Sequence, residues 1–140
     1  MFNISHLHPM VVHFPIAIIM VGFLADLLSL VIKKERCLST MGLYLEMLGV
    51  LAVIVAFGTG YFLTGTTIED AGLVGKHHEL FATMTLVTIL VAGFFRVLIV
   101  YMKQDDSYLK YVSSGIFFLA AIFVGITGFF GGMIVFGGGT

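Results

Sequence analysis

The chain has 140 residues, of which 59% are hydrophobic and 11% are charged, and its formal net charge is −1. Because soluble domains carry about 25% charged residues, this composition excludes an ordinary water-soluble fold. The near-neutral charge does not predict a nucleic-acid partner, since such a partner binds a basic surface. A chain of this length is expected to form one domain, residues 1–140.

Four apolar segments are each long enough to cross a bilayer, which takes roughly 20 residues: residues 10–32, 42–64, 78–102 and 112–136. The amino terminus has no basic stretch and no small-residue cleavage site, so we expect the first segment to be a permanent span. The short loops make successive helices antiparallel. The sequence therefore predicts an all-α membrane protein, a four-helix up-down transmembrane bundle in contact with the lipid bilayer.

The basic residues predict how the bundle is oriented. Most of them lie in the first and third loops: Lys33, Lys34, Arg36, Lys103 and Lys110. The second loop, residues 65–76, has only Lys76. Because short loops rich in Lys and Arg stay cytoplasmic, we expect a multi-pass protein of the bacterial inner membrane with both termini outward.

The chain's histidines form two short runs: His6, His8, His13, His77 and His78. The predicted topology brings both runs to the outer ends of the first and third helices, which lie diagonally across a square bundle. An imidazole in an apolar medium is unfavourable unless it binds a ligand or forms a hydrogen bond. The runs therefore predict a site at the outer end.

Local patterns select among these histidines. Pro9 suits the first turn of a helix, so we expect His8 to lie on the entering segment and His13 within the helix. Arg96 follows His78 by 18 residues, five helical turns, so the two share a face. An arginine inside a span is expected to face the bundle interior, which predicts that His78 points inward and His77 does not.

The interpretation that we favour is haem b with bis-histidine ligation. His13 and His78 are the expected axial ligands, and His8 and His77 are second choices. The remaining His6 or His8 would then pair with His77 in a second site or form hydrogen bonds to the haem propionates.

Glycines cluster at the same depth in the second and fourth helices: Gly58, Gly60, Gly125 and Gly128. They either leave room for a flat ligand or let the helices pack closely.

Two alternatives to haem remain. Three or four imidazoles with Met10 would suit Zn or Cu, and histidines that only form hydrogen bonds would be structural.

A second polar group is expected at the inner end, because Asp26, Glu46 and Arg96 lie at similar depth, about 6–9 Å from the inner helix ends. The group is either a structural ion-pair clamp or part of a proton pathway or quinone site. Its two carboxylates and one guanidinium sum to −1, which predicts that one carboxylate shares a proton.

The run LHPMVVHFPIA, residues 7–17, resembles the opening motif of a bacterial family of small membrane proteins, the domain of unknown function 2231 family. The resemblance extends to Gly60-Tyr61, to His77 or His78, and to Gly131-Gly132. It implies a four-span protein whose relatives are sometimes joined to cytochrome-like or iron–sulfur domains. It supports a redox setting and implies no established reaction.

These observations predict a membrane-embedded, b-type cytochrome-like electron-transfer protein. Its electron partner would be a quinone, a periplasmic cytochrome or the other subunits of a larger respiratory complex to which it belongs. The alternatives are an outer-face metal-ion binding or transport module and a structural subunit without a cofactor. No hydrolase or nucleotide-binding motif is present in the sequence, so an electron-transfer subunit is favoured over a stand-alone enzyme.

Overall fold

The computed structural model describes residues 7–32, 36–63, 69–103 and 108–137. Its four long helices are α1 (Leu7–Val31), α2 (Arg36–Leu63), α4 (Gly72–Met102) and α5 (Tyr108–Gly137). Each is long and apolar enough to cross a membrane. The predicted all-α bundle is therefore confirmed, and the predicted spans fall within these helices to within one residue.

Two helices begin earlier than the sequence predicts. α1 begins at Leu7 and so includes His8, and α4 begins at Gly72 rather than at His78. The first backbone N–H groups of a helix need no partner within it, so Pro9 is accepted in the first turn of α1. The expectation that His8 lies outside the helix is wrong.

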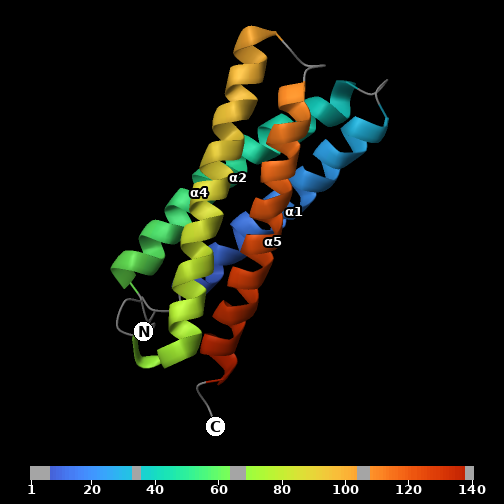
Figure 1. Ribbon diagram of the computed structural model, residues 1–140. Helices are drawn as coiled ribbons and strands as arrows, with labels where there is room; N and C mark the ends of the chain where they lie inside the picture. Colours follow the sequence, from blue (N-terminus) through green and yellow to red (C-terminus); the bar gives the residue numbers. More distant parts are fainter. Residues whose placement is uncertain (1–6, 33–35, 64–68, 104–107, 138–140) are drawn as a thin grey trace.

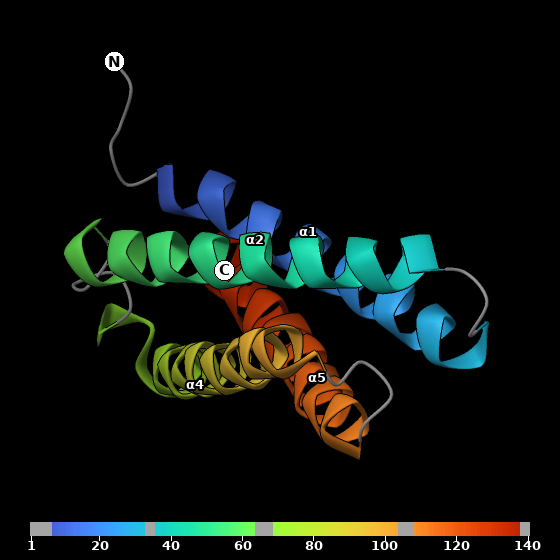
Figure 2. The same cartoon turned by 90° about the horizontal axis from the view of Figure 1, so that it is seen from above.

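The helices are arranged as two antiparallel pairs. α1 packs along α2 and α4 packs along α5, whereas the contacts of α1 with α5 and of α2 with α4 are less extensive. The two pairs cross at an angle (Figures 1 and 2). As predicted, α1 and α4 lie on a diagonal. We call the region where the side chains of the two helix pairs meet the seam.

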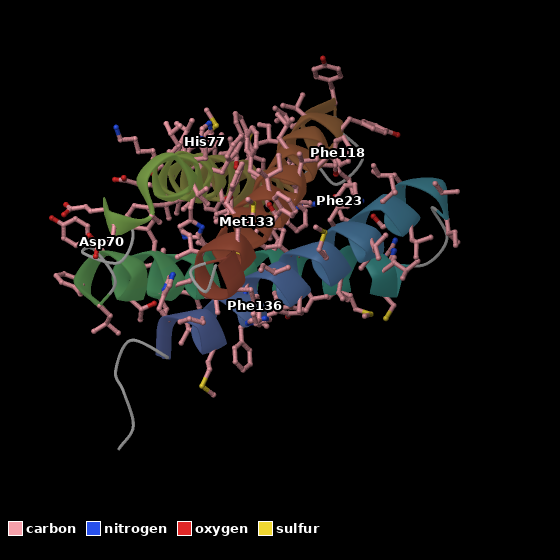
Figure 3. All side chains as sticks on the ribbon, turned by 90° about the horizontal axis from the view of Figure 1, so that it is seen from below. Phe23, Asp70, His77, Phe118, Met133 and Phe136 are labelled. Carbon is pink, nitrogen blue, oxygen red and sulfur yellow. The ribbon has the colours of Figure 1, made fainter. Side chains whose placement is uncertain are left out.

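The buried core fills the middle of this seam. Its residues come from all four helices: Ile19, Val53, Ile89, Ala92, Phe117, Ala120, Ala121 and Val124. Large apolar side chains also cover the outside, as at Phe118 and Phe136 (Figure 3). A helix that is apolar on all sides is typical of a membrane span.

Two of the glycines predicted to border a cofactor instead allow α1 and α5 to pack closely. A Cβ at Gly128 would lie 2.8 Å from Ile16 Cδ1, and one at Gly125 would lie 3.3 Å from Met20 Cε. Side chains of α1 therefore occupy the space beside both glycines. Of the two roles that the sequence left open for Gly125 and Gly128, these contacts favour close helix packing.

Candidate functional site

Two polar clusters join the helix pairs, one at each end of the bundle. We call the end that holds the first residues of α1 and α4 the histidine end, and the other the opposite end. In Figure 1 the histidine end lies towards the bottom, where α4 begins and α5 ends.

At the histidine end, His8 of α1 faces His78 of α4 across the seam. Their ring centroids are 6.4 Å apart and their planes are nearly perpendicular, at 88°. His78 is buried and His8 is half-buried. The structure therefore brings together one histidine from each run and from each helix pair.

Hydrogen bonds determine the tautomer of both rings. His78 Nδ1 lies 3.1 Å from the backbone oxygen of Thr127, so it must carry the hydrogen and donate. The Thr59 hydroxyl donates to the oxygen of Ala56 at 2.9 Å. It therefore accepts from His8 Nδ1, 3.1 Å away. In the neutral form, each ring then has its lone pair on Nε2, which no described residue contacts by a hydrogen bond.

Glycines on the neighbouring helices make room for the two rings. A Cβ at Gly60 would lie 3.0 Å from His8 Cε1, and one at Gly131 would lie 3.3 Å from His78 Cε1. The sequence predicted that Gly60 lines the site. Gly131 was part of the family resemblance and was not predicted to lie near a histidine. A Cβ at Gly58 would meet no atom within 4 Å, so Gly58 borders neither ring.

The predicted pair of His13 with His78 is not formed. His13 is exposed, and its Nδ1 donates to the oxygen of Pro9 in the same helix at 2.6 Å. Residues five apart on a helix point about 140° apart. With His8 inside α1 and facing the seam, His13 must point to the outside. His8, the second choice, is the histidine of α1 that meets His78.

The remaining histidines do not join the pair. His77 is exposed, its ring stacks on Phe130 with centroids 5.4 Å apart, and its Nδ1 donates to the oxygen of Leu73 at 2.7 Å. His6 lies outside the described residues. Within the described ranges, no group of three or more His, Cys, Asp or Glu side chains is placed to hold a metal ion.

At the opposite end, Arg96 of α4 binds both predicted carboxylates. Its Nε donates to Glu46 Oε2 of α2 at 2.8 Å, and its Nη2 lies 2.5 Å from Asp26 Oδ1 of α1. Asp26 and Glu46 are fully buried. The cluster that the sequence predicted from depth alone is therefore present.

Ser114 adds the fourth helix to this cluster, which sequence reasoning missed. Its hydroxyl donates to Asp26 Oδ2. A serine within an apolar span carries no signal of its own, because its hydroxyl can bond to its own helix. Gly42 completes the local packing, since a Cβ there would lie 3.2 Å from the backbone of Asp26.

Comparison with known families agrees with this architecture. A family model described as "Predicted membrane protein (DUF2231)" matches residues 5–140. The chain belongs to this family. No curated protein and no solved structure matches the chain.

In this DUF2231 protein the two polar clusters are separated by the apolar core. On α4, Ile89 and Ala92 lie between His78 and Arg96, and on α1 Ile19 lies between His8 and Asp26. These core side chains are almost completely buried. The described part of the DUF2231 chain therefore offers no continuous polar path from one cluster to the other.

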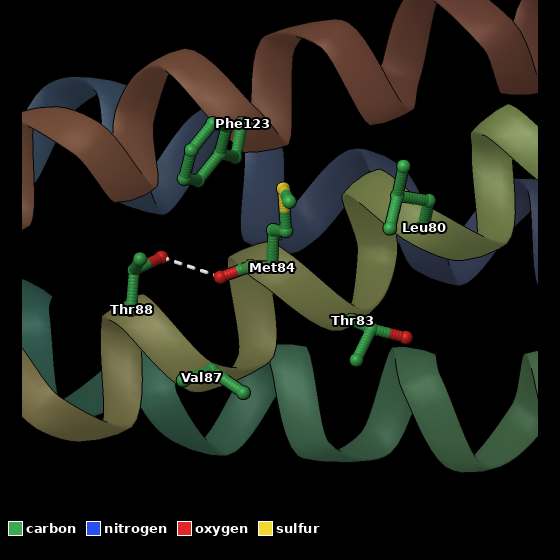
Figure 4. Close-up of a pocket in the computed structure, with 6 residues that line it drawn as sticks. All are labelled: Leu80, Thr83, Met84, Val87, Thr88 and Phe123. Atoms are coloured by element: carbon green, nitrogen blue, oxygen red, sulfur yellow. Dashed lines mark hydrogen bonds between the residues drawn. The ribbon is translucent and has the colours of Figure 1, made fainter.

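A shallow groove on the outer surface of α4 and α5 is apolar. Six residues line it: Leu80, Thr83, Met84, Val87, Thr88 and Phe123 (Figure 4). The hydroxyl of Thr88 donates to the backbone oxygen of Met84 at 2.7 Å, and that of Thr83 donates to the backbone oxygen of Glu79 at 2.9 Å. Both hydroxyls are thus used within α4, and the groove has the character of a surface that lipid covers.

Proposed function

We propose that this DUF2231 protein is a b-type cytochrome-like electron-transfer protein that holds haem b between His8 and His78. The observation that carries the proposal is the His8–His78 pair itself. The two imidazoles come from diagonal helices and lie 6.4 Å apart, and neither Nε2 forms a hydrogen bond with any residue that the structure describes. Four-helix bundles commonly hold cofactors in this way, with ligands from facing helices.

The separation of the two rings supports this assignment. With metal–nitrogen bonds of about 2.0 Å, two imidazoles that bind the same metal have their centroids within about 6 Å of each other, so rings 6.4 Å apart would need to move little to hold one. Histidines that bind metals usually donate their other ring N–H to a carbonyl, carboxylate or water. The Thr127 carbonyl and the Thr59 hydroxyl accept those hydrogens here. Both residues would hold the rings in the orientation that ligation needs.

The number of ligands favours haem over a simple metal ion. Structural zinc sites take four protein ligands and catalytic ones three, whereas two axial histidines suffice for a b-type haem. Among the described residues only two imidazoles converge. His8 and His78 belong to different helix pairs, so a flat group between them would lie in the less extensively packed seam.

When bound, haem would supply one-electron transfer. The chain's own residues would orient the group and exclude water from it. Because Arg36, Lys103 and Lys110 flank the opposite end and only Lys76 lies at the histidine end, we propose that the histidine end faces outward from the bacterial inner membrane. A quinone in the bilayer, a respiratory-complex subunit or a periplasmic cytochrome would then be the electron partner.

The test is a pyridine haemochrome spectrum of the full-length protein, purified in detergent from haem-supplied cells. We expect a b-type spectrum and a Soret band that shifts on reduction with dithionite. His8→Ala and His78→Ala should each lose most of the haem. His13→Ala and His77→Ala, which change exposed histidines of the same helices, should retain it.

Other outcomes would overturn the proposal in distinct ways. A colourless protein with stoichiometric zinc or copper would show a metal-ion site. A colourless protein without metal would show that the two rings are only structural. Loss of haem in His13→Ala but not in His8→Ala would show that the ligands are the pair expected from sequence.

A further inference from the structure

The cluster at the opposite end has an unbalanced charge. Asp26 and Glu46 are fully buried, and Arg96 is 3% exposed. These are the only charged side chains that the described residues place in contact with one another there, and α5 contributes the uncharged Ser114. Two carboxylates and one guanidinium leave a charge of −1 inside an apolar bundle. Such a buried charge is usually removed by taking up a proton.

The hydrogen bonds distinguish the two carboxyl groups. Asp26 contacts Arg96 through Oδ1 and accepts the Ser114 hydroxyl through Oδ2. Glu46 accepts Arg96 Nε through Oε2, but its Oε1 is buried and has no hydrogen-bond partner among the described residues. Among the described residues Oδ1 of Asp26 has no hydrogen bond of its own, but its contact with the guanidinium is an ion pair. A positive charge beside one oxygen and a donated hydrogen bond to the other both stabilise an ionised carboxylate. A buried anionic oxygen without a partner is far less favourable than a neutral hydroxyl.

We infer that the Asp26–Glu46–Arg96 cluster is a binding site for one exchangeable proton, which Glu46 carries on Oε1 at neutral pH. Asp26 remains ionised and forms the ion pair with Arg96, so the loaded cluster is neutral. This inference does not depend on haem and holds whether or not the histidine pair binds a cofactor.

The surroundings of the cluster determine from which side the proton comes. Towards the histidine end, the buried side chains of Ile19, Ile89 and Phe117 close the seam. Towards the opposite end, polar groups continue. The Ser29 hydroxyl donates to the backbone oxygen of Asp26, and Lys110 Nζ donates to the Ser39 hydroxyl at 3.1 Å. The proton therefore exchanges with water at the opposite end only.

The inference is tested by infrared spectroscopy of the full-length protein in detergent at neutral pH. We expect one carbonyl-stretch band of a protonated, buried carboxyl group, which moves to lower frequency in D₂O. Carboxyl ¹³C labelling of glutamate should shift this band, whereas labelling of aspartate should not. Glu46→Gln should remove the band. Glu79→Gln, a matched change at an exposed glutamate of α4, should leave it.

Charge counting gives a second test. Asp26→Asn leaves one carboxyl group beside Arg96, so Glu46 should ionise and the band should disappear. Because glutamine has the shape and charge of a protonated glutamate, Glu46→Gln should keep the thermal midpoint of the wild type, which shows that loss of the band is not loss of the fold. Absence of the band in the wild type, a band that moves with aspartate labelling, or a band that does not move in D₂O would each overturn the inference.

Discussion

Arg96→Leu is expected to lower the free energy of unfolding by about 3–5 kcal/mol, the usual result of removing one partner from a buried ion pair. The variant leaves the carboxylate of Asp26, which is fully buried, without a counter-charge. It also removes the contacts by which α4 is joined to both α1 and α2. The measurement is a titration of the purified protein from mild detergent into SDS.

Two further variants show whether the loss has this cause. Arg36→Leu makes the same chemical change at an exposed arginine and should change stability by less than about 0.5 kcal/mol. The triple variant Asp26→Leu, Glu46→Leu, Arg96→Leu replaces the whole cluster with apolar side chains and should regain most of the lost stability. If Arg96→Leu were as stable as the wild type, the ion pair would have no role in joining the two helix pairs.

Gly42→Leu is the second change with a large expected effect. Gly42 of α2 is buried, and an added Cβ would lie 3.2 Å from the backbone N and Cα of Asp26. Backbone atoms in a packed helix cannot rotate away as a side chain can, so the rest of the leucine would push α1 and α2 apart. Overpacking of this kind costs about 1–3 kcal/mol, and displacement of Asp26 from Arg96 would add to it.

The matched control is Gly115→Leu, because Gly115 is exposed within α5 and an added Cβ there meets nothing within 4 Å. That variant should be as stable as the wild type or more so, since leucine favours a helix more than glycine does. Equal stability of the two variants in the SDS titration would show that the close approach at Gly42 is unimportant.

Some features of the site could be predicted from local patterns. Asp26, Glu46 and Arg96 were placed together because depth follows from residue count along a helix. The inward direction of His78 followed from its shared face with Arg96, and both are buried. Each inference used the geometry of one straight helix.

Other features depended on packing between helices. His8 rather than His13 meets His78 because α1 begins at Leu7 and turns that face to the seam. Aliphatic side chains of α1 pack against Gly125 and Gly128, whereas imidazole rings pack against Gly60 and Gly131. Glycines in a span look alike in the sequence, and only the neighbouring helix decides what lies against each one.

The sequence by itself determined four membrane spans, their antiparallel order and two levels of polar residues, because span length and helical rise are properties of each segment alone. Only the tertiary structure decided which histidine of α1 faces His78, which glycines pack against helices, and that Ser114 completes the charged cluster. The physical reason is that these helices are apolar on all sides. Their buried faces are chosen by shape and hydrogen bonding between helices, not by a hydrophobic pattern within each one.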